Sequence, residues 1–173
     1  PELGLNPHLL DVITQASAMH DIGKIAVPDS ILLKPGRLTN EEFEVMKSHT
    51  TRGSEVIEMI KDVQDKEYYD MCLDICRHHH ERWDGGGYPD GLKGEQNSIG
   101  AQLTALADVY DALVSDRVYK AAFSVDKAYN MIKSGECGVF SPKLMACFEF
   151  ARLDMEKIVA QTKAAESAEN GSK

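Results

Sequence analysis

Several features that mark other classes of protein are scarce in this sequence. No apolar run approaches the roughly 18 residues of a membrane-spanning helix, and no signal-peptide pattern is evident, so we expect a cytoplasmic protein without membrane contact. Basic residues are in deficit, because 19 Lys and Arg face 28 Asp and Glu, for a formal net charge of −9. This balance argues against a polymeric nucleic acid as partner, since such binding depends on neutralising phosphates. A small anionic ligand stays compatible with it, because metal ions or a few positioned cations can hold one locally.

Cysteines and strand signals are also sparse. Four cysteines in 173 residues are too few for a disulfide scaffold. Cys72 and Cys76 lie one helical turn apart beside a histidine run, which allows a zinc site. Their spacing instead matches the apolar face of a helix that includes Tyr69 and Leu73, so we expect buried thiols. No strand, repeat or low-complexity linker is evident, and the sequence therefore predicts one domain of the all-α class.

Helical periodicity runs through most of the chain. Asn6 can cap a first helix that ends at His20, and Thr39 with Glu42 forms a capping box for another. Gly53 is expected to interrupt the helix that follows. After about residue 160 the composition turns to Ala, Glu, Ser and Gly, and a frayed tail is predicted over 161–173. Helices are predicted over residues 6–20, 39–49, 56–60, 69–80, 99–113, from 124, and from 141.

The most unusual stretch is HHHERWDGGGYPDG at residues 78–91. Successive helical residues point about 100° apart, so three consecutive histidines cannot all face an apolar core. A surface histidine cluster is one interpretation, and a metal site is the other. The helical phase places His79 or His80 on the inner face and His78 to one side. The glycines then end the helix, and a long loop to about Gln96 follows, of a kind that is usually functional or mobile.

Other residues can complete a metal site. His20 finishes an apolar helix face and Asp21 follows it, and a buried carboxylate is costly unless it is paired or bound to metal. His49 lies on the buried stripe of its helix. Asp108 and Asp111 interrupt the apolar middle of the helix over 99–113, and either can instead belong to a solvated face.

Three cations are candidates for contact with an anionic substrate. Lys24 lies one turn after the His-Asp pair. Arg117 and Lys120 lie one turn apart, a spacing that usually marks a solvated face and that can also clamp a phosphate.

The candidate ligands are nitrogen and oxygen donors without thiolates, spread over four helices. This pattern favours a site with several metal ions over a structural zinc site. Iron or manganese suits the imidazoles better than calcium. The six candidates are His20, Asp21, His49, His79, His80 and Asp108.

Five motifs resemble the HD-GYP family, a branch of the HD phosphohydrolases. They are HDIGK at 20–24, MKSH at 46–49, HHERWDGGGYPDGLKG at 79–94, ADVYDAL at 107–113 and DRVYK at 116–120. The resemblance covers roughly residues 15 to 150. It implies an HD-type helical bundle with a Gly-rich GYP loop and a metal-dependent phosphodiesterase of bacterial signal transduction. The family hydrolyses cyclic di-GMP to pGpG and on to GMP at a site with two or three divalent ions.

The resemblance also assigns roles to individual residues. Lys24 would contact the scissile phosphate or the attacking hydroxide, and Arg117 and Lys120 would hold the dinucleotide. Residues Gly87, Tyr88 and Pro89 would form a surface loop for substrate access and for docking of GGDEF-domain partners. The metal ligands would be His20, Asp21, His49, His79, His80 and Asp108, with Asp21 bridging.

This sequence departs from the family pattern in two places. The family normally carries a further histidine ligand on a helix before the one that ends in His20, and His8 does not replace it. We therefore expect residues 1–160 to be an HD-GYP domain lacking its first helix or helices, from a longer chain with a receiver or sensor domain upstream. At residues 97–102 the family usually shows Ile-Pro-Leu and an arginine, in place of NSI and Gln102.

Two other functions compete with hydrolysis of cyclic di-GMP. One is a non-hydrolysing module that binds this nucleotide or a GGDEF partner, with an incomplete metal site. The other is an HD phosphohydrolase for other nucleotides, against which the GYP loop argues.

Overall fold

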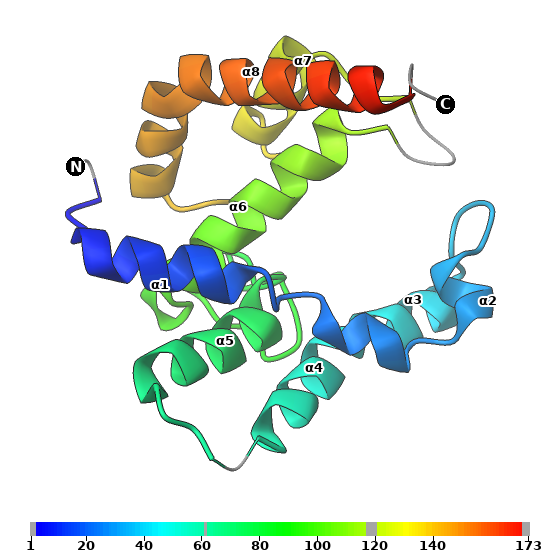
Figure 1. Cartoon of the computed structure of the whole chain (residues 1–173). Coiled ribbons are helices and arrows are strands. Elements are labelled where there is room, and N and C mark those ends of the chain that lie inside the picture. Colours follow the sequence, from blue (N-terminus) through cyan, green and yellow to red (C-terminus); the bar gives the residue numbers. More distant parts are fainter. Residues whose placement is uncertain (1–2, 61, 117–120, 171–173) are drawn as a thin grey trace.

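The computed structural model describes residues 3–60, 62–116 and 121–170, with the backbone alone for residues 163 and 166–170. Within these ranges the regular structure is helical (Figure 1), which confirms the all-α prediction, and the β-type pairing is a single isolated bridge between Asp84 and Lys93. No helix in the described part is long and apolar enough to cross a membrane. In chain order the helices are α1 (Pro7–Ser17), η1 (Ile22–Ala26), α2 (Asp29–Leu32), α3 (Asn40–Lys47), α4 (His49–Glu58), α5 (Lys66–His78), η2 (Gly94–Gln96), α6 (Ile99–Val114), α7 (Val125–Lys133) and α8 (Pro142–Asn170).

Short local signals start most of these helices. Asn6 caps α1, and Thr39 caps α3 in a capping box with Glu42, as the sequence predicts. Ser98 and Ser124 cap α6 and α7 in the same way, by accepting a backbone N–H of the first turn. Such caps satisfy donors that have no partner inside the helix, and each contributes about 1 kcal/mol.

Two predicted helix boundaries are wrong. α1 ends at Ser17, so His20 and Asp21 lie in the turn that leads into η1. Gly53 does not interrupt its helix, because α4 runs through it without a break. The glycine serves packing instead, since a Cβ there would lie 2.4 Å from Sγ of Cys76 in α5. At the other end of the chain, α8 runs to Asn170.

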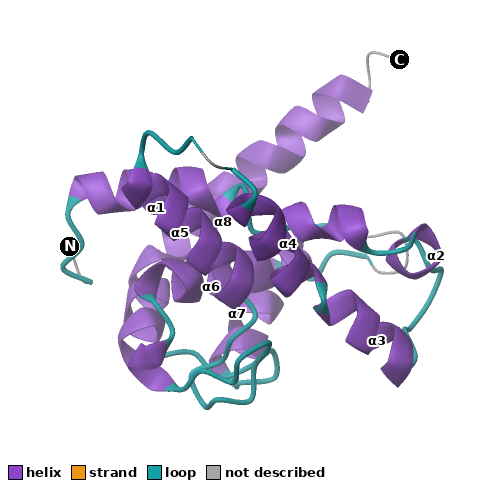
Figure 2. Ribbon diagram, turned by 90° about the horizontal axis from the view of Figure 1, so that it is seen from below, coloured by secondary structure: helices purple, strands orange, loops and turns teal. Residues whose placement is uncertain are grey.

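Two apolar clusters hold the helices together. α6, α7 and α8 share one core, with Tyr110, Ile132 and Phe148 among its buried members. α1, α4 and α5 share the other, in which Cys72 and Cys76 are buried free thiols, as predicted. Figure 2 shows these helices in purple joined by loops, with α8 extending away from the others.

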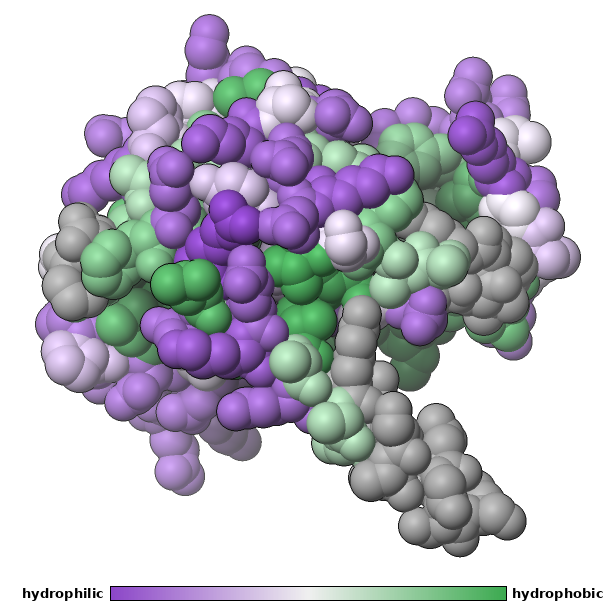
Figure 3. All heavy atoms as spheres, turned by 90° about the horizontal axis from the view of Figure 1, so that it is seen from above, coloured by the Kyte–Doolittle hydropathy of each residue, from purple (hydrophilic) through white to green (hydrophobic). Residues whose placement is uncertain are grey.

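The projecting helix α8 contributes to a mixed surface. Its side chains Phe150, Leu153 and Ile158 are exposed. The face drawn in Figure 3 is largely hydrophilic, with apolar side chains gathered in patches among the polar ones. The histidine-rich region lies where the ends of α4, α5 and η1 meet, away from α8.

Candidate metal centre

Helix ends and turns from separate parts of the chain converge at one place. The tight approach between η1 and α4 is possible because Gly23 has no side chain, since a Cβ there would lie 1.9 Å from the carbonyl oxygen of His49. Thus a glycine inside the HDIGK motif brings the turn before η1 against the first residue of α4. The converging residues are His20 and Asp21 before η1, His49 at the start of α4, His79 and His80 after α5, and Asp108 in α6.

Asp21 lies at the centre of this group. Its Oδ1 is 3.5 Å from Nε2 of His49 and 4.0 Å from Nε2 of His79. Its Oδ2 is 3.3 Å from Nε2 of His20. Oδ1 is also buried and has no hydrogen-bond partner among the described residues. A buried carboxylate oxygen without a partner is costly, so this atom fits a bound cation, and the two oxygens face different histidines as a bridging ligand requires.

Three histidines form a compact set of nitrogen donors. One ring nitrogen from each of His49, His79 and His80 lies within 4.8 Å of the others. In each of three histidines, Nδ1 lies within hydrogen-bond distance of a backbone carbonyl oxygen about one turn earlier in the chain. The distances are 2.7 Å for His49, 3.0 Å for His79 and 2.6 Å for His20. When Nδ1–H donates to a carbonyl, the lone pair of Nε2 is free to bind metal.

The protonation of the group suits metal binding. Burial lowers the pKa of His79 to about 3 and that of His80 to about 4, so both are neutral near pH 7. Burial also lowers the pKa of His49, whereas a hydrogen bond to Asp21 raises the pKa of His20. Burial alone would raise the pKa of Asp21, but hydrogen bonds from His20 and Lys24 bring it well below its ordinary range. Neutral imidazole and ionised carboxylate are the forms that bind metals.

Asp108 and Lys24 lie at the edge of the cluster. Oδ1 of the half-buried Asp108 is 4.0 Å from Nε2 of His20. Nζ of Lys24 donates to Oδ2 of Asp21 at 2.5 Å. Asp111, the other acid of α6, is exposed and accepts a hydrogen bond from Ser115 at 3.0 Å. The solvated-face interpretation therefore applies to Asp111.

His78 lies outside the cluster, on the side that the helical phase predicts. Its Nδ1 is 2.8 Å from Asp74 and its Nε2 is 3.0 Å from Asp90. Arg77 also donates to Asp90, at 2.7 and 2.8 Å. These contacts hold the glycine-rich loop that carries Asp90 against α5.

Glu81 is an important residue that the sequence reasoning missed. Its side chain is buried, and its carboxylate accepts the backbone N–H groups of Asp90 at 2.6 Å, Gly91 at 3.0 Å and Leu92 at 3.0 Å. It thereby closes the loop into a compact unit. The available signal was an acid directly after the histidines, and nothing in the local sequence indicates partners 9 to 11 residues ahead.

The predicted loop residues lie beside the histidines. The N–H of Tyr88 donates to the carbonyl of His80 at 3.2 Å, and the two rings lie 4.9 Å apart between centroids. The peptide bond between Tyr88 and Pro89 is cis. A Cβ on Gly87 would lie 2.4 Å from a backbone nitrogen, so a glycine is required there. The GYP motif thus covers one side of the candidate centre.

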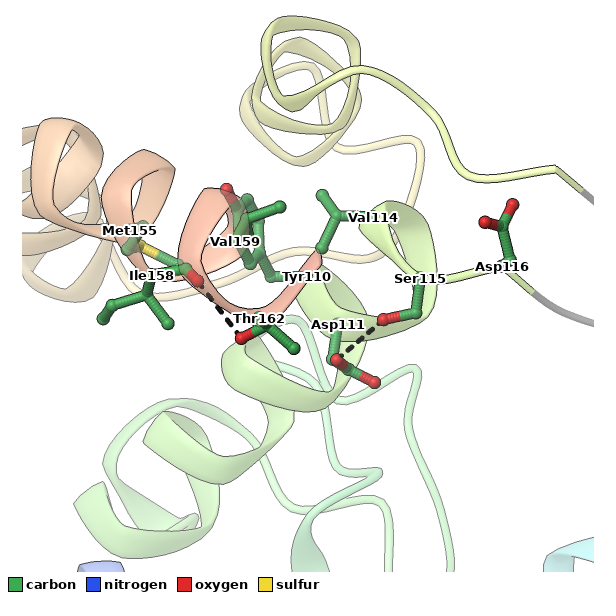
Figure 4. A pocket seen from close by; sticks show the side chains of 9 residues that line it. All are labelled: Tyr110, Asp111, Val114, Ser115, Asp116, Met155, Ile158, Val159 and Thr162. Atoms are coloured by element: carbon green, nitrogen blue, oxygen red, sulfur yellow. Dashed lines mark hydrogen bonds between the residues drawn. The ribbon is translucent and has the colours of Figure 1, made fainter. Parts of the chain in front are cut away.

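The predicted phosphate clamp, Arg117 and Lys120, lies outside the described residues. A cavity of about 280 Å³ lies elsewhere, between α6 and α8 (Figure 4). Tyr110, Met155 and Val159 contribute to its walls, and none of the predicted site residues lines it.

Known proteins resemble this chain over most of its length. A protein of Vibrio cholerae serotype O1 named cyclic di-GMP phosphodiesterase is 43% identical over 145 residues, which are 83% of this chain and 30% of that protein. A cyclic di-GMP phosphodiesterase response regulator of Xanthomonas campestris pv. campestris is 40% identical over 160 residues, 92% of this chain and 41% of that protein. A 3′3′-cGAMP-specific phosphodiesterase of V. cholerae is 38% identical over 142 residues, 82% of this chain and 26% of that protein. The chain spans less than half the length of each relative.

The match to the HD domain family extends over residues 2–143, most of the chain. The HD domain is a metal-dependent hydrolase fold, and it implies binding of divalent metal ions. The all-α architecture and the convergent histidines and aspartates are consistent with it. On the extent of this match, the chain belongs to the HD domain family.

Proposed function

We propose that this chain hydrolyses cyclic di-GMP to pGpG or GMP at a centre that holds two or three divalent metal ions. The observation that carries the proposal is the position of Asp21, whose unpartnered oxygen Oδ1 is buried between His49 and His79 while Oδ2 faces His20. Relatives that are 43% and 40% identical bear the name of this activity, which supports the choice of substrate.

The donor set suits two ions that share Asp21. His49, His79 and His80 would hold one with Asp21, and His20 and Asp108 would hold the other. Nitrogen and oxygen donors of this kind suit iron or manganese. Such ions, when bound, supply a nucleophile derived from water at neutral pH and neutralise charge on phosphoryl oxygens.

The side chains of the chain itself prepare the site for a phosphodiester. Lys24, held at 2.5 Å from Asp21, places a positive charge at the edge of the centre, where it would contact the scissile phosphate. The lowered pKa values of His79 and His80 leave one nitrogen of each ring without a proton near pH 7. Arg117 and Lys120 would hold the dinucleotide phosphates, and the loop with Gly87, Tyr88 and Pro89 would border the substrate.

The decisive test is the substitution Asp21→Ala. We expect metal content, measured by elemental analysis, to fall, and cleavage of cyclic di-GMP with iron or manganese, followed by chromatography, to decrease at least about 100-fold. The matched control is Asp111→Asn, which changes an exposed acid that pairs with Ser115. The assay is run on this chain and on a version extended at its N-terminus. Near-normal turnover by the Asp21→Ala variant would contradict the assignment of this site as the catalytic metal centre.

A second candidate substrate is 3′3′-cGAMP, because a relative 38% identical is named as specific for it. Parallel assays with both cyclic dinucleotides distinguish the two. Binding of cyclic di-GMP without product, in the extended version loaded with metal, would instead favour a non-hydrolysing module.

The same proposal extends to the setting of the chain. The response-regulator name of one relative supports a cytoplasmic signalling protein in which a receiver or sensor domain controls this one. GGDEF-domain proteins would dock on the loop that carries Tyr88 and Pro89.

A further inference from the structure

An aromatic side chain of α3 lies exposed beside the candidate centre. Phe43 keeps 46% of its surface exposed, and no residue of α3 is buried. Its ring meets the ring of Tyr88 edge to face, with centroids 6.2 Å apart and planes at 83°. A single exposed phenylalanine is ordinary on a protein surface. This one differs because the ring it touches belongs to the loop over the histidines.

Consecutive ring contacts connect Phe43 with the metal ligands. Tyr88 lies 4.9 Å from His80, and His80 lies 5.1 Å from His49, between ring centroids. The Tyr88 ring therefore lies between Phe43 and the histidine cluster. Phe43 is thus one aromatic ring further from the histidines than Tyr88.

A cation accompanies the two rings. Nζ of Lys47 lies 5.6 Å from the centroid of Phe43 and 5.6 Å from that of Tyr88. Glu44 pairs with the same ammonium at 2.7 Å. Attraction to aromatic faces and to a carboxylate restricts where this flexible side chain points. The result is an ammonium donor held at the rim of an exposed aromatic ring.

This pairing matches the chemistry of a guanine. Every nucleobase stacks on an aromatic ring, whereas the O6 and N7 acceptors of guanine select a lysine or arginine donor. Adenine offers an N6 donor beside N7, and a side-chain amide such as that of glutamine suits it better.

We propose that Phe43 and Lys47 form a base-recognition shelf, on which the Phe43 ring stacks against a guanine of the substrate and Lys47 donates to its O6 and N7. The inference rests on the proposed function and names the residues that set its preference for guanine. Phe43 and Lys47 would act as specificity residues, since the proposal places them at the base and Lys24 at the scissile phosphate.

The test compares Phe43→Ala, Phe43→Tyr and Lys47→Gln with the unchanged chain, loaded with manganese. For Phe43→Ala we expect KM for cyclic di-GMP to rise about 10-fold, with kcat changed less than about twofold. Phe43→Tyr keeps a stacking ring and should restore KM. Lys47→Gln should shift the ratio of kcat/KM for cyclic di-GMP over 3′3′-cGAMP about 10-fold toward 3′3′-cGAMP. Metal content and thermal unfolding should not change.

Two controls separate base recognition from other effects. Phe150→Ala removes a more exposed ring on α8, 75% exposed, and should leave both constants unchanged. Methyl 4-nitrophenyl phosphate has a phosphodiester and no nucleobase, so Phe43→Ala should hydrolyse it at the unchanged rate.

An unchanged KM for cyclic di-GMP in Phe43→Ala would refute the proposed base-recognition shelf, and the exposed surface of α3 would then fit a protein partner instead. Equal losses on the dinucleotide and on the simple diester also overturn it, because the variant would then disturb the reacting centre. If the unchanged chain cleaves no dinucleotide, the proposed function fails separately. Calorimetric titration with cyclic di-GMP then tests the base-recognition shelf. We expect Phe43→Ala to bind the dinucleotide about 10-fold more weakly than the unchanged chain, and equal binding would refute the proposal.

Discussion

Glu81→Gln tests whether a single buried carboxylate organises the loop beside the candidate metal centre. Oε1 of Glu81 accepts the N–H groups of Asp90 and Gly91, and Oε2 accepts that of Leu92. An amide oxygen can keep the first two bonds. The amide NH₂ then faces the N–H of Leu92, so one bond to a charged acceptor is lost and one donor is left without a partner.

The expected magnitude follows from these bonds. A hydrogen bond to a charged group contributes about 1.5–3 kcal/mol, and an unsatisfied buried donor costs about 1–3 kcal/mol. Because the loop can partly relax, we expect the free energy of unfolding to fall by about 2–3 kcal/mol. For a domain of this size each kcal/mol shifts Tm by about 2–4 °C, so Tm should fall by roughly 4–12 °C.

Circular dichroism gives the thermal transition, and hydrogen exchange reports the three amides directly. We expect faster exchange at Asp90, Gly91 and Leu92, while amides of the α6 core change no more than global stability requires. The control is Glu44→Gln, which alters a side chain that is 69% exposed and forms an ion pair with Lys47. Such a surface change should cost less than about 0.5 kcal/mol. A Glu81 variant with the Tm and the amide protection of the unchanged chain would refute the reasoning.

Two other substitutions examine the packing and the loop. Gly23→Ala places a Cβ 1.9 Å from the His49 carbonyl oxygen, so it should push η1 away from α4 and lower both Tm and metal content. The control is Gly86→Ala, whose Cβ would meet a flexible side chain at 3.1 Å and should lower neither quantity. Unchanged metal content in the Gly23 variant would contradict the prediction. Hydrogen bonds from Arg77 and then His78 lower the pKa of Asp90, so its contribution to stability is complete above the ordinary value and is lost as pH falls through the lowered one. Asp90→Asn should therefore melt below the unchanged chain between about pH 5 and 7, and the difference in Tm should shrink below about pH 4; a difference that persists there contradicts the ion pair.

Local features of the chain were predictable because they act within about one helical turn. Asn6, Thr39 and Ser124 begin helices through side chains that bond N–H groups three residues later. The apolar phase of α5 correctly placed Cys76 inside and His78 to one side. The kinds of donor atom on offer could also be identified, because histidine and aspartate side chains carry nitrogen and oxygen donors whatever the fold.

Contacts between distant segments were not visible in this way. Periodicity favoured a break at Gly53, but the approach of Cys76 makes that glycine a packing position inside α4. The same holds for Glu81, whose partners lie on the far side of the loop, and for Phe43, whose neighbour Tyr88 is brought by another segment.

The sequence by itself determined the helical class, the capping residues and the kinds of atom available to bind metal. The tertiary structure decided how the two oxygens of Asp21 divide between His20 on one side and His49 and His79 on the other. The physical reason is range: propensity and capping depend on neighbours one turn away, whereas these distances depend on how closely η1, α4 and α5 pack. That closeness is permitted by two missing side chains, at Gly23 and Gly53.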